Sequence, residues 1–251
     1  MYYITTLPKY FPVSSAIRKA LQEKLDRRIL ISRREHIIRR YGKIILNVGT
    51  AYNYKHLFIN DKVINLPEVC SLSGNKLRTL SLFSNYVPTV EIKHGIPENY
   101  PVLKRNDINS FHGKGIEFIT SEENFWEPGY YSPYISFSTE YRIMIVVFSN
   151  EIKMMRVFRK DLLPEYENEL FVPRNAEHCK YYRISNPKMS KLPDFLNGII
   201  GAMSNFKNYY LGLDVGRIGK ELVLIETNSA PGMNSITIDE FIDVIINELG
   251  I

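Results

Sequence analysis

The sequence predicts a mixed fold of helices and strands, in the α+β or α/β class. A helical pattern near the N-terminus leads into a short buried strand, as in an open α/β layer. Three later stretches, residues 100–119, 139–158 and 212–232, each place two apolar segments around turn residues, which predicts β-hairpins. With 251 residues the chain can bury a substantial core, in one domain or two small ones.

The composition is that of a soluble globular protein, with 45% hydrophobic and 24% charged residues. No apolar stretch is long enough to span a bilayer, and Met1-Tyr2-Tyr3 does not open a signal peptide, so we expect no membrane partner. Cys70 and Cys179 lack the spacing of metal ligands, which favours free thiols in a reducing cytosol. We therefore expect a cytoplasmic protein.

Residues 14–40 are predicted to be mostly helical. Ser14 or Ser15 can cap the helix, and apolar residues recur at every fourth position (Ile17, Leu21 and Leu25). The segment Lys43–Gly49 then forms a short strand that ends in a glycine turn. In open α/β layers, ligands bind beyond the ends of such strands.

Positive charge is concentrated between Arg18 and Lys43, where ten basic residues stand against three acidic ones. This basic stripe carries +7, more than the net charge of +5, so the rest of the chain carries −2. A solvated helical face explains the stripe, and so does a surface for an anionic partner such as nucleic acid or an acidic peptide. Both interpretations stay open at this point.

The hairpin over residues 212–232 gathers oxygen-bearing side chains at one end. Its turn at Gly219-Lys220 brings Asp214 opposite residue 225 or 226, and Glu226 and Asn228 point to one face of their strand. Carboxylates in a buried hairpin are costly unless a cation lies between them. Hard oxygen ligands with room for water and phosphate suit Mg²⁺ rather than zinc. Asp214 alone is better explained as a strand residue near a solvated loop, but the set predicts a metal site.

The hairpin over residues 100–119 has the residues of a phosphate-binding loop. Lys104 and Arg105 end its first strand, and His112-Gly113-Lys114-Gly115 precedes its second. Glycines on both sides of a lysine let the backbone approach a ligand while the amides and the lysine face outward. Gly-x-Gly between strands is most often only a turn. Beside two basic residues and a metal site, it favours phosphate binding.

The hairpin over residues 139–158, which turns at Ser149-Asn150, is predicted to hold a central strand because of its continuous β-forming residues. Glu140 and Arg142 are two apart and share a face. They form either an exposed ion pair of little energetic value or part of a site.

Three further helices are predicted. Ser73-Gly74-Asn75-Lys76 opens one toward Leu82, and Leu192–Tyr210 forms another. Thr237-Ile238-Asp239-Glu240 fits a capping box that opens the last helix. That helix places its apolar residues inward (Phe241, Ile242, Ile245 and Ile246).

Asp214-Val215-Gly216 followed by Glu226-Thr227-Asn228-Ser229-Ala230-Pro231-Gly232 resembles the metal-binding end of the ATP-grasp carboxylate–amine ligases. The spacing is most similar to that of the short ATP-grasp proteins encoded by bacteriophages, and a viral protein would act in the host cytoplasm. The resemblance covers roughly residues 65 to 235. It implies the ATP-grasp fold, two α+β lobes gripping a nucleotide, after a small α/β N-terminal domain. The corresponding domains are 1–75, 76–135 and 136–251.

The resemblance also implies the cofactors, ATP and Mg²⁺. Asp214, Glu226 and Asn228 correspond to the family's ligands for one or two metal ions. The nucleotide-binding positions correspond to a helix-start lysine, the phosphate hairpin, the segment beside the base and one strand carboxylate (Lys76, Lys104, Arg105, His112, Gly113, Lys114, Gly115, Tyr134, Ile135 and Glu140).

Two of these correspondences are incomplete. The family's strand lysine falls on Arg105 here, with Lys104 one residue short, so either residue can be the phosphate contact. The two are not equivalent, because arginine holds phosphate bidentately and lysine acts as a point charge. Tyr134 and Ile135 have no acidic residue beside them, which leaves another purine nucleotide open.

The catalytic positions implied by the resemblance are Arg142 and Arg159, with Arg156 or Lys160 as replacements for Arg159. Arg142 would face the transferred phosphoryl group or the carboxylate substrate. Substrate-side positions fall on Arg174-Asn175 and on Asn47-Val48-Gly49-Thr50.

These parts predict phosphoryl transfer, in which positioning and charge neutralisation supply most of the acceleration. A substrate carboxylate attacks the γ-phosphate of ATP, and an amine then displaces phosphate from the acylphosphate to leave an amide. The substrates are a carboxylate and an amine, from an amino acid, peptide or protein. The basic stripe leaves open that the substrate is anionic. Two alternatives remain: a kinase on the same scaffold, and a nucleic-acid-binding protein that uses residues 18–43.

Overall fold

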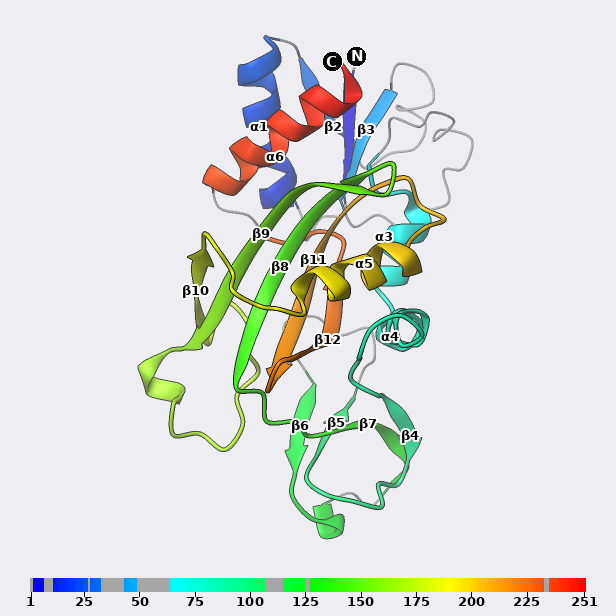
Figure 1. The fold of residues 1–251 in the computed structure, drawn as a ribbon, viewed down its shortest axis with the longest axis vertical. Coiled ribbons are helices and arrows are strands. Elements are labelled where there is room, and N and C mark those ends of the chain that lie inside the picture. Colours follow the sequence, from blue (N-terminus) through cyan, green and yellow to red (C-terminus); the bar gives the residue numbers. More distant parts are fainter. Residues whose placement is uncertain are drawn as a thin grey trace.

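The computed structural model describes residues 2–6, 11–26, 28–32, 43–48, 64–106, 115–124, 127–232 and 235–251. In these ranges the strands form three sheets, which follow one another from the N-terminal end of the molecule to the opposite end (Figure 1). None of the helices in the described ranges is both long and apolar enough to cross a lipid bilayer.

The N-terminal sheet is parallel and has the strand order β2-β1-β3. Its strands are β1 (Tyr2–Thr6), β2 (Ile29–Ser32) and β3 (Lys43–Val48), and α1 (Phe11–Leu25) connects the first two. The predicted helix over residues 14–40 is therefore wrong at Ile29–Ser32, and its residues 33–40 lie outside the described ranges. Asp26 takes a left-handed conformation (φ 47°), which ends the helix, and the β-forming run that follows becomes β2.

The central sheet is antiparallel, with the order β10-β9-β8-β11-β12. Its strands are β8 (Thr139–Phe148), β9 (Glu151–Leu162), β10 (Cys179–Ile184), β11 (Asn208–Ile218) and β12 (Glu221–Asn228). The predicted hairpins over 139–158 and 212–232 are β8–β9 and β11–β12. Their alternation gives this sheet one face covered by helices and a second face that lines a cavity and, toward the N-terminal sheet, packs against the last helix.

Three helices cover the first of these faces: α3 (Pro67–Ser73), α4 (Lys76–Phe83) and α5 (Leu192–Ala202). The helix predicted to open at Ser73–Lys76 is α4, where the Asn75 side chain accepts a hydrogen bond from the Arg78 amide at 3.0 Å. The predicted helix Leu192–Tyr210 ends early, at Ala202. Tyr209 and Tyr210 are fully buried strand residues instead, in β11 beside β8.

The small sheet is antiparallel, with the order β4-β7-β5-β6, and lies at the end of the molecule away from the termini (Figure 1). Its strands are β4 (Lys93–Gly95), β5 (Val102–Arg105), β6 (Ile116–Ile119) and β7 (Gly129–Pro133). The predicted hairpin over 100–119 is β5–β6. Two 3₁₀ turns, η3 (Glu122–Asn124) and η4 (Pro164–Tyr166), interrupt the connections.

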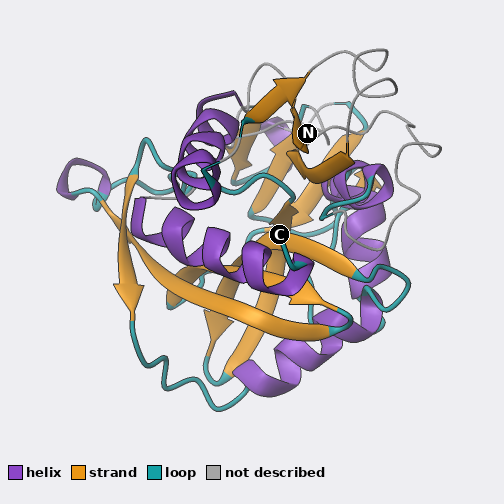
Figure 2. Cartoon of the chain, turned by 90° about the horizontal axis from the view of Figure 1, so that it is seen from above, coloured by secondary structure: helices purple, strands orange, loops and turns teal. Residues whose placement is uncertain are grey.

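The last helix, α6 (Ser235–Leu249), packs on the N-terminal part of the chain. Its Phe241 and Ile242 share one apolar core with Ile17 and Leu21 of α1 and with Ile4 of β1. Seen from above, the helix that ends near the C-terminus lies over a long strand (Figure 2), in agreement with the contacts between α6 and β9. The helix begins two residues before the predicted capping box, so Thr237 is buried in the first turn and does not cap it. The three-domain division at residues 75 and 135 remains a prediction.

A close approach between α5 and the turn after α4 gives a stability prediction. A Cβ at Gly198 would lie 2.5 Å from Val87 Cγ1 and 2.7 Å from the backbone oxygen of Tyr86. Gly198→Ala is expected to lower the free energy of unfolding by about 1–3 kcal/mol, because this overpacking outweighs the higher helix propensity of alanine. Urea denaturation measures the change.

Gly201→Ala is the matched control, one helical turn away. Its Cβ would meet the ring of Tyr86 at 3.3 Å, and that ring is half exposed and can move. A loss for Gly201→Ala as large as that for Gly198→Ala would contradict the packing argument.

Candidate functional site

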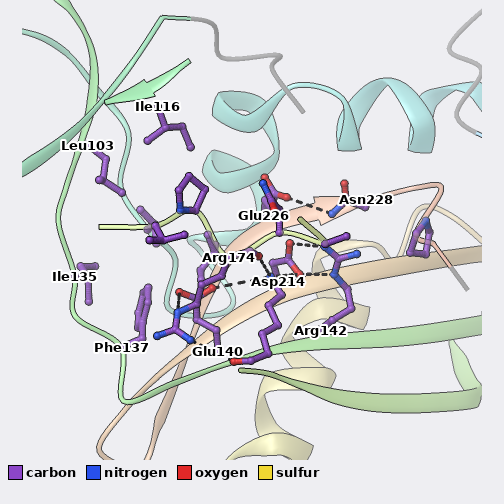
Figure 3. A pocket seen from close by; sticks show the side chains of 18 of the residues that line it. Leu103, Ile116, Ile135, Phe137, Glu140, Arg142, Arg174, Asp214, Glu226 and Asn228 are labelled. Atoms are coloured by element: carbon purple, nitrogen blue, oxygen red, sulfur yellow. Dashed lines mark hydrogen bonds and ion pairs between the residues drawn. The ribbon is translucent and has the colours of Figure 1, made fainter. Parts of the chain in front are cut away.

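A cavity of about 1100 Å³ lies against the second face of the central sheet and reaches the small sheet (Figure 3). Strands β8, β9, β11 and β12 supply its charged wall, and Leu103 and Ile116 of the small sheet line its other side. The chain between β7 and β8, residues 134–137, and the loop over residues 167–176 also line it, as do residues 70–75 and 229–232.

Asp214 lies in the charged wall, opposite Glu226 on β12 and Arg142 on β8. Arg142 donates to both carboxylate oxygens, from Nε to Oδ1 and from Nη2 to Oδ2 at 2.7 Å. Lys160 Nζ lies 2.9 Å from Oδ1. Burial by itself would raise the pKa of Asp214, but Arg142 and Lys160 outweigh it and hold the pKa well below its ordinary value. The carboxylate is therefore charged and bound to two cations.

Glu140, Lys160 and Arg174 form a second group beside Asp214. Glu140 lies 3.4 Å from Arg174 Nε and 4.0 Å from Lys160 Nζ. Lys160 donates to the backbone oxygen of Arg174 at 3.2 Å, and Arg174 Nη1 donates to that of Lys160 at 3.3 Å. Burial raises the pKa of Glu140, with Lys160 and Arg174 opposing the rise. These contacts tie the 167–176 loop to the charged wall.

Glu226 and Asn228 point to the same face of β12, as predicted, and Asn228 Nδ2 donates to Glu226 Oε1 at 3.4 Å. Lys76 Nζ lies 3.4 Å from the other oxygen, Oε2. Lys76 is the first residue of α4, and only 8% of it is exposed. The helix start therefore delivers a buried cation to this carboxylate.

The predicted metal ligands all line the cavity, but their surroundings differ. Both Asp214 oxygens are occupied by cations, whereas Glu226 has one cation and the Asn228 amide nearby. In the described part of the chain, no three His, Cys, Asp or Glu side chains are placed to hold a metal by themselves. The donor set fits Mg²⁺, which is commonly bound by one or two carboxylates together with substrate phosphates and waters.

The phosphate hairpin places Arg105, not Lys104, in the cavity. Arg105 is 7% exposed and its Nη2 lies 3.4 Å from the Ser132 hydroxyl, while its buried Nε has no hydrogen-bond partner among the described residues. Burial lowers the pKa of its guanidinium. Lys104 belongs to the opposite face of β5 and does not line the cavity. Gly115 adopts φ 71° and closes the hairpin; His112, Gly113 and Lys114 lie outside the described residues.

The predicted base-binding segment lines the apolar end of the cavity through Tyr134 and Ile135. Phe171 of the 167–176 loop stacks on Phe118, with ring centroids 5.7 Å apart, and Tyr134 contacts Phe118 edge-on. A Cβ on Gly216 would lie 2.3 Å from the Phe137 ring, so glycine is required where this ring packs on β11. Of this loop, only Arg174-Asn175 was predicted to belong to the site, and both line the cavity. The rest of the loop mixes prolines, charges and short apolar runs, which carry no clear signal.

Arg159, a predicted catalytic residue, does not line the cavity. Arg159 is half exposed, pairs with Asp161 at 2.6 Å and lies over the Tyr182 ring, on the other face of β9. Lys160, which was named as a replacement, is 2% exposed and reaches Asp214. Arg156, the other replacement, pairs with Glu240.

The residues of the N-terminal predictions lie only partly within the described ranges. Asn47 is fully buried in β3, and Gly49 and Thr50 lie outside the described residues. In the basic stripe, Lys19 lies 3.9 Å from Glu23 and Lys24 pairs with Asp243. The described stripe is thus partly neutralised and is not one helical face, which gives no support to nucleic-acid binding.

Comparison with known proteins identifies the fold. No protein-family model matches the sequence, and no curated protein matches it. Solved structures do match. Phosphoribosylamine–glycine ligase from Thermotoga maritima has a TM-score of 0.70 at 13% identity over 99% of this chain and 75% of that one.

Two further structures match over most of both chains. D-alanine–D-alanine ligase from Bacillus anthracis, complexed with ATP, has a TM-score of 0.63 at 11% identity, over 99% of this chain and 95% of that one. The ATP-grasp ligase PsnB, complexed with a minimal precursor, has a TM-score of 0.62 at 10% identity, over 98% of each chain. At these identities the likeness is one of fold: the chain adopts the ATP-grasp fold, as the sequence predicted.

Proposed function

We propose that the protein is an ATP-dependent ligase that joins a carboxylate to an amine through an acylphosphate. The observation that carries this proposal is the cavity, where Asp214, Glu226 and Asn228 lie beside buried cations in an ATP-grasp fold. The three matched structures described above are named as ligases, and the D-alanine–D-alanine ligase is complexed with ATP. We also propose that the protein is related to the short ATP-grasp proteins encoded by bacteriophages, because its motifs resemble theirs.

The charge around Asp214 and Glu226 favours a polyphosphate. Five cations (Lys76, Arg105, Arg142, Lys160 and Arg174) are grouped with three carboxylates (Glu140, Asp214 and Glu226), so this group is net +2 before any metal ion is added. Two further carboxylates of the cavity lining, Glu167 and Glu169, belong to the exposed part of the 167–176 loop. Fixed positive charge in a partly enclosed cavity stabilises anions more strongly than the same charge in water.

Each residue has a proposed role. Glu226 and Asn228, with Asp214 behind them, would hold Mg²⁺, which when bound neutralises phosphate charge and orients the γ-phosphoryl group. Arg105 would bind the nucleotide's phosphates, and Arg142 and Lys160 would stabilise charge on the transferred group. Asp214 holds these last two cations in position.

The reaction balances in two steps. A carboxylate oxygen attacks the γ-phosphorus, the bond to the β-γ bridging oxygen breaks, and ADP leaves. The amine nitrogen then attacks the acyl carbon, phosphate leaves with the former carboxylate oxygen, and the nitrogen loses a proton to give the amide. Both steps would occur in the cavity between the central sheet and the small sheet. Residues 76–135 and 136–251 are proposed as the two lobes that grip the nucleotide.

An isotope experiment tests this sequence. The protein is incubated with ATP, Mg²⁺ and pools of ¹⁸O-carboxylate amino acids and peptides. We expect ADP release that requires a carboxylate and an amine, and one ¹⁸O atom in the phosphate released. A stable phosphorylated product without an amide would identify a kinase instead.

We also propose a cytoplasmic location, which for a viral protein is the cytoplasm of the host. The two cysteines, which are free and buried, support a reducing compartment.

A matched pair of variants tests the nucleotide site. Arg105→Met removes a buried guanidinium from the cavity, so we expect the Kd for Mg²⁺-ATP to rise about 10–100-fold, as for loss of a charged hydrogen bond. Lys104→Met removes the same charge from the opposite face of β5 and is expected to bind ATP like the wild type. Calorimetric titration with ATP and Mg²⁺ measures both. Weaker binding by Lys104→Met than by Arg105→Met would reverse the assignment.

A further inference from the structure

The sheet face that holds Arg142 continues beyond the cavity. Alternate residues share a face, so Met144 follows Arg142 on β8, and both line the cavity together with Phe158 on β9. Arg156 is paired with Met144, and Arg183 on β10 is paired with Phe158. Both arginines therefore lie on the same face of the sheet as the cavity. Arg156 is two residues from Phe158 along β9, and Arg183 is beside Phe158 on the neighbouring strand.

These two arginines share one carboxylate from the last helix. Arg156 Nε donates to Glu240 Oε2 at 2.5 Å, and Arg183 Nη2 donates to Glu240 Oε1 at 3.0 Å. The hydrogen bonds from Arg156 and Arg183 lower the pKa of Glu240, so its carboxylate is charged near neutral pH. The cluster keeps a net charge of +1, and all three side chains are partly exposed, between 26% and 38%.

The distance between Arg142 and the pair Arg156–Arg183 sets the length of a ligand that could contact both cationic groups. Two residues along a strand span about 6.6 Å and neighbouring strands are about 4.8 Å apart, so the backbones of Arg142 and Arg156 are about 8 Å apart. Met144 and Phe158 lie between them, and Tyr181 lies beside Arg142, with its ring centroid 5.9 Å from the guanidinium carbon. The face thus presents cations, an apolar span and cations again.

We propose that the carboxylate substrate carries a second carboxylate, which binds Arg156 and Arg183. This inference rests on the proposed ligase function and specifies its substrate class: a dicarboxylic acid, or a peptide with an acidic residue next to the reacting carboxylate. The reacting carboxylate lies by Arg142 and Lys160, and the chain between the two acids lies on the apolar span. Arginine suits the second site because its planar fork binds a carboxylate through two N–H groups.

The test compares a diacid with a monoacid of the same length. Hydroxylamine serves as the amine, because it converts an acylphosphate to a hydroxamate. We expect kcat/KM for adipate to exceed that for hexanoate about 10–100-fold in the wild type, and this ratio to fall at least tenfold in Arg183→Met. Arg183→Lys is expected to recover part of the ratio. Lys180→Met, an exposed lysine on the other face of β10, is expected to keep it.

Failure of this inference differs from failure of the ligase function. Hydroxamate formation with equal preference for both acids, unchanged in Arg183→Met, overturns the second carboxylate site and leaves the ligase intact. If no acid gives hydroxamate, calorimetric titration with adipate and hexanoate decides the site alone. Binding of adipate that needs Arg183 supports the site while the ligase function fails, and equal binding of the two acids overturns the site.

Discussion

Asp214→Ala is expected to lower the free energy of unfolding by about 3–5 kcal/mol, the cost of leaving buried charges without their partner. Arg142 and Lys160 both contact this carboxylate, and neither cation can reach water easily because Lys160 is 2% exposed and Arg142 is 18% exposed. We also expect the variant to lose ligase activity, since both cations lose their fixed position. Urea denaturation and ADP release measure the two effects.

A double-mutant cycle separates two contributions to the lower stability of Asp214→Ala: the loss of the carboxylate itself and the unpaired guanidinium of Arg142. Arg142→Met removes the unpaired guanidinium, so the double variant with Asp214→Ala is expected to be less destabilised than the sum of the single variants, by about 0.5–3 kcal/mol. The exposed pair Arg159–Asp161 on the other face is the control, and Asp161→Ala is expected to cost only about 0–1 kcal/mol. Strict additivity at Asp214 and Arg142 would contradict the buried-pair argument.

Lys160→Met is expected to lower kcat about 10²–10³-fold, the usual cost of removing one fixed group that stabilises transition-state charge. The variant should fold, because Asp214 keeps both hydrogen bonds from Arg142. The change in KM for ATP is expected to be smaller than the change in kcat, since the effect lies in the transition state. Steady-state ADP release measures both constants.

Arg159→Met is the matched control for Lys160→Met. The two residues are neighbours on β9 with side chains on opposite faces, and each variant removes one positive charge. We expect Arg159→Met to retain activity near that of the wild type. If Arg159→Met were the inactive variant, the resemblance would have located the catalytic cation correctly and our assignment from the structure would be wrong.

The register of β8–β9 explains why Lys160, rather than Arg159, points into the cavity. The strands pair Phe148 with Glu151 beside the turn, and a regular hairpin would then pair Glu140 with Arg159. An irregularity between Val146 and Val147 adds one residue to β9, so Glu140 is paired with Lys160. A one-residue slip moves every following side chain to the other face. No residue in the sequence marks this bulge.

The same effect settles a prediction that the sequence left open. Asp214 was expected to face residue 225 or 226, and a register shift between Asp214 and Val215 selects Glu226. The hairpins were predictable because turn residues and two-residue alternation are local signals. The ATP-grasp fold and most of the charged wall followed from the resemblance of residues 214–216 and 226–232 to a known family. The contacts of Arg174 and Phe171 were not predictable, because they bring the 167–176 loop onto strands distant in sequence.

The shared core of the first and last elements constrains how the chain can fold during synthesis. Ile4 and Ile17 lie in one apolar core with Phe241 and Ile242 of α6 and with residues of the central sheet. The core is therefore incomplete on the ribosome until residues 235–249 have been translated.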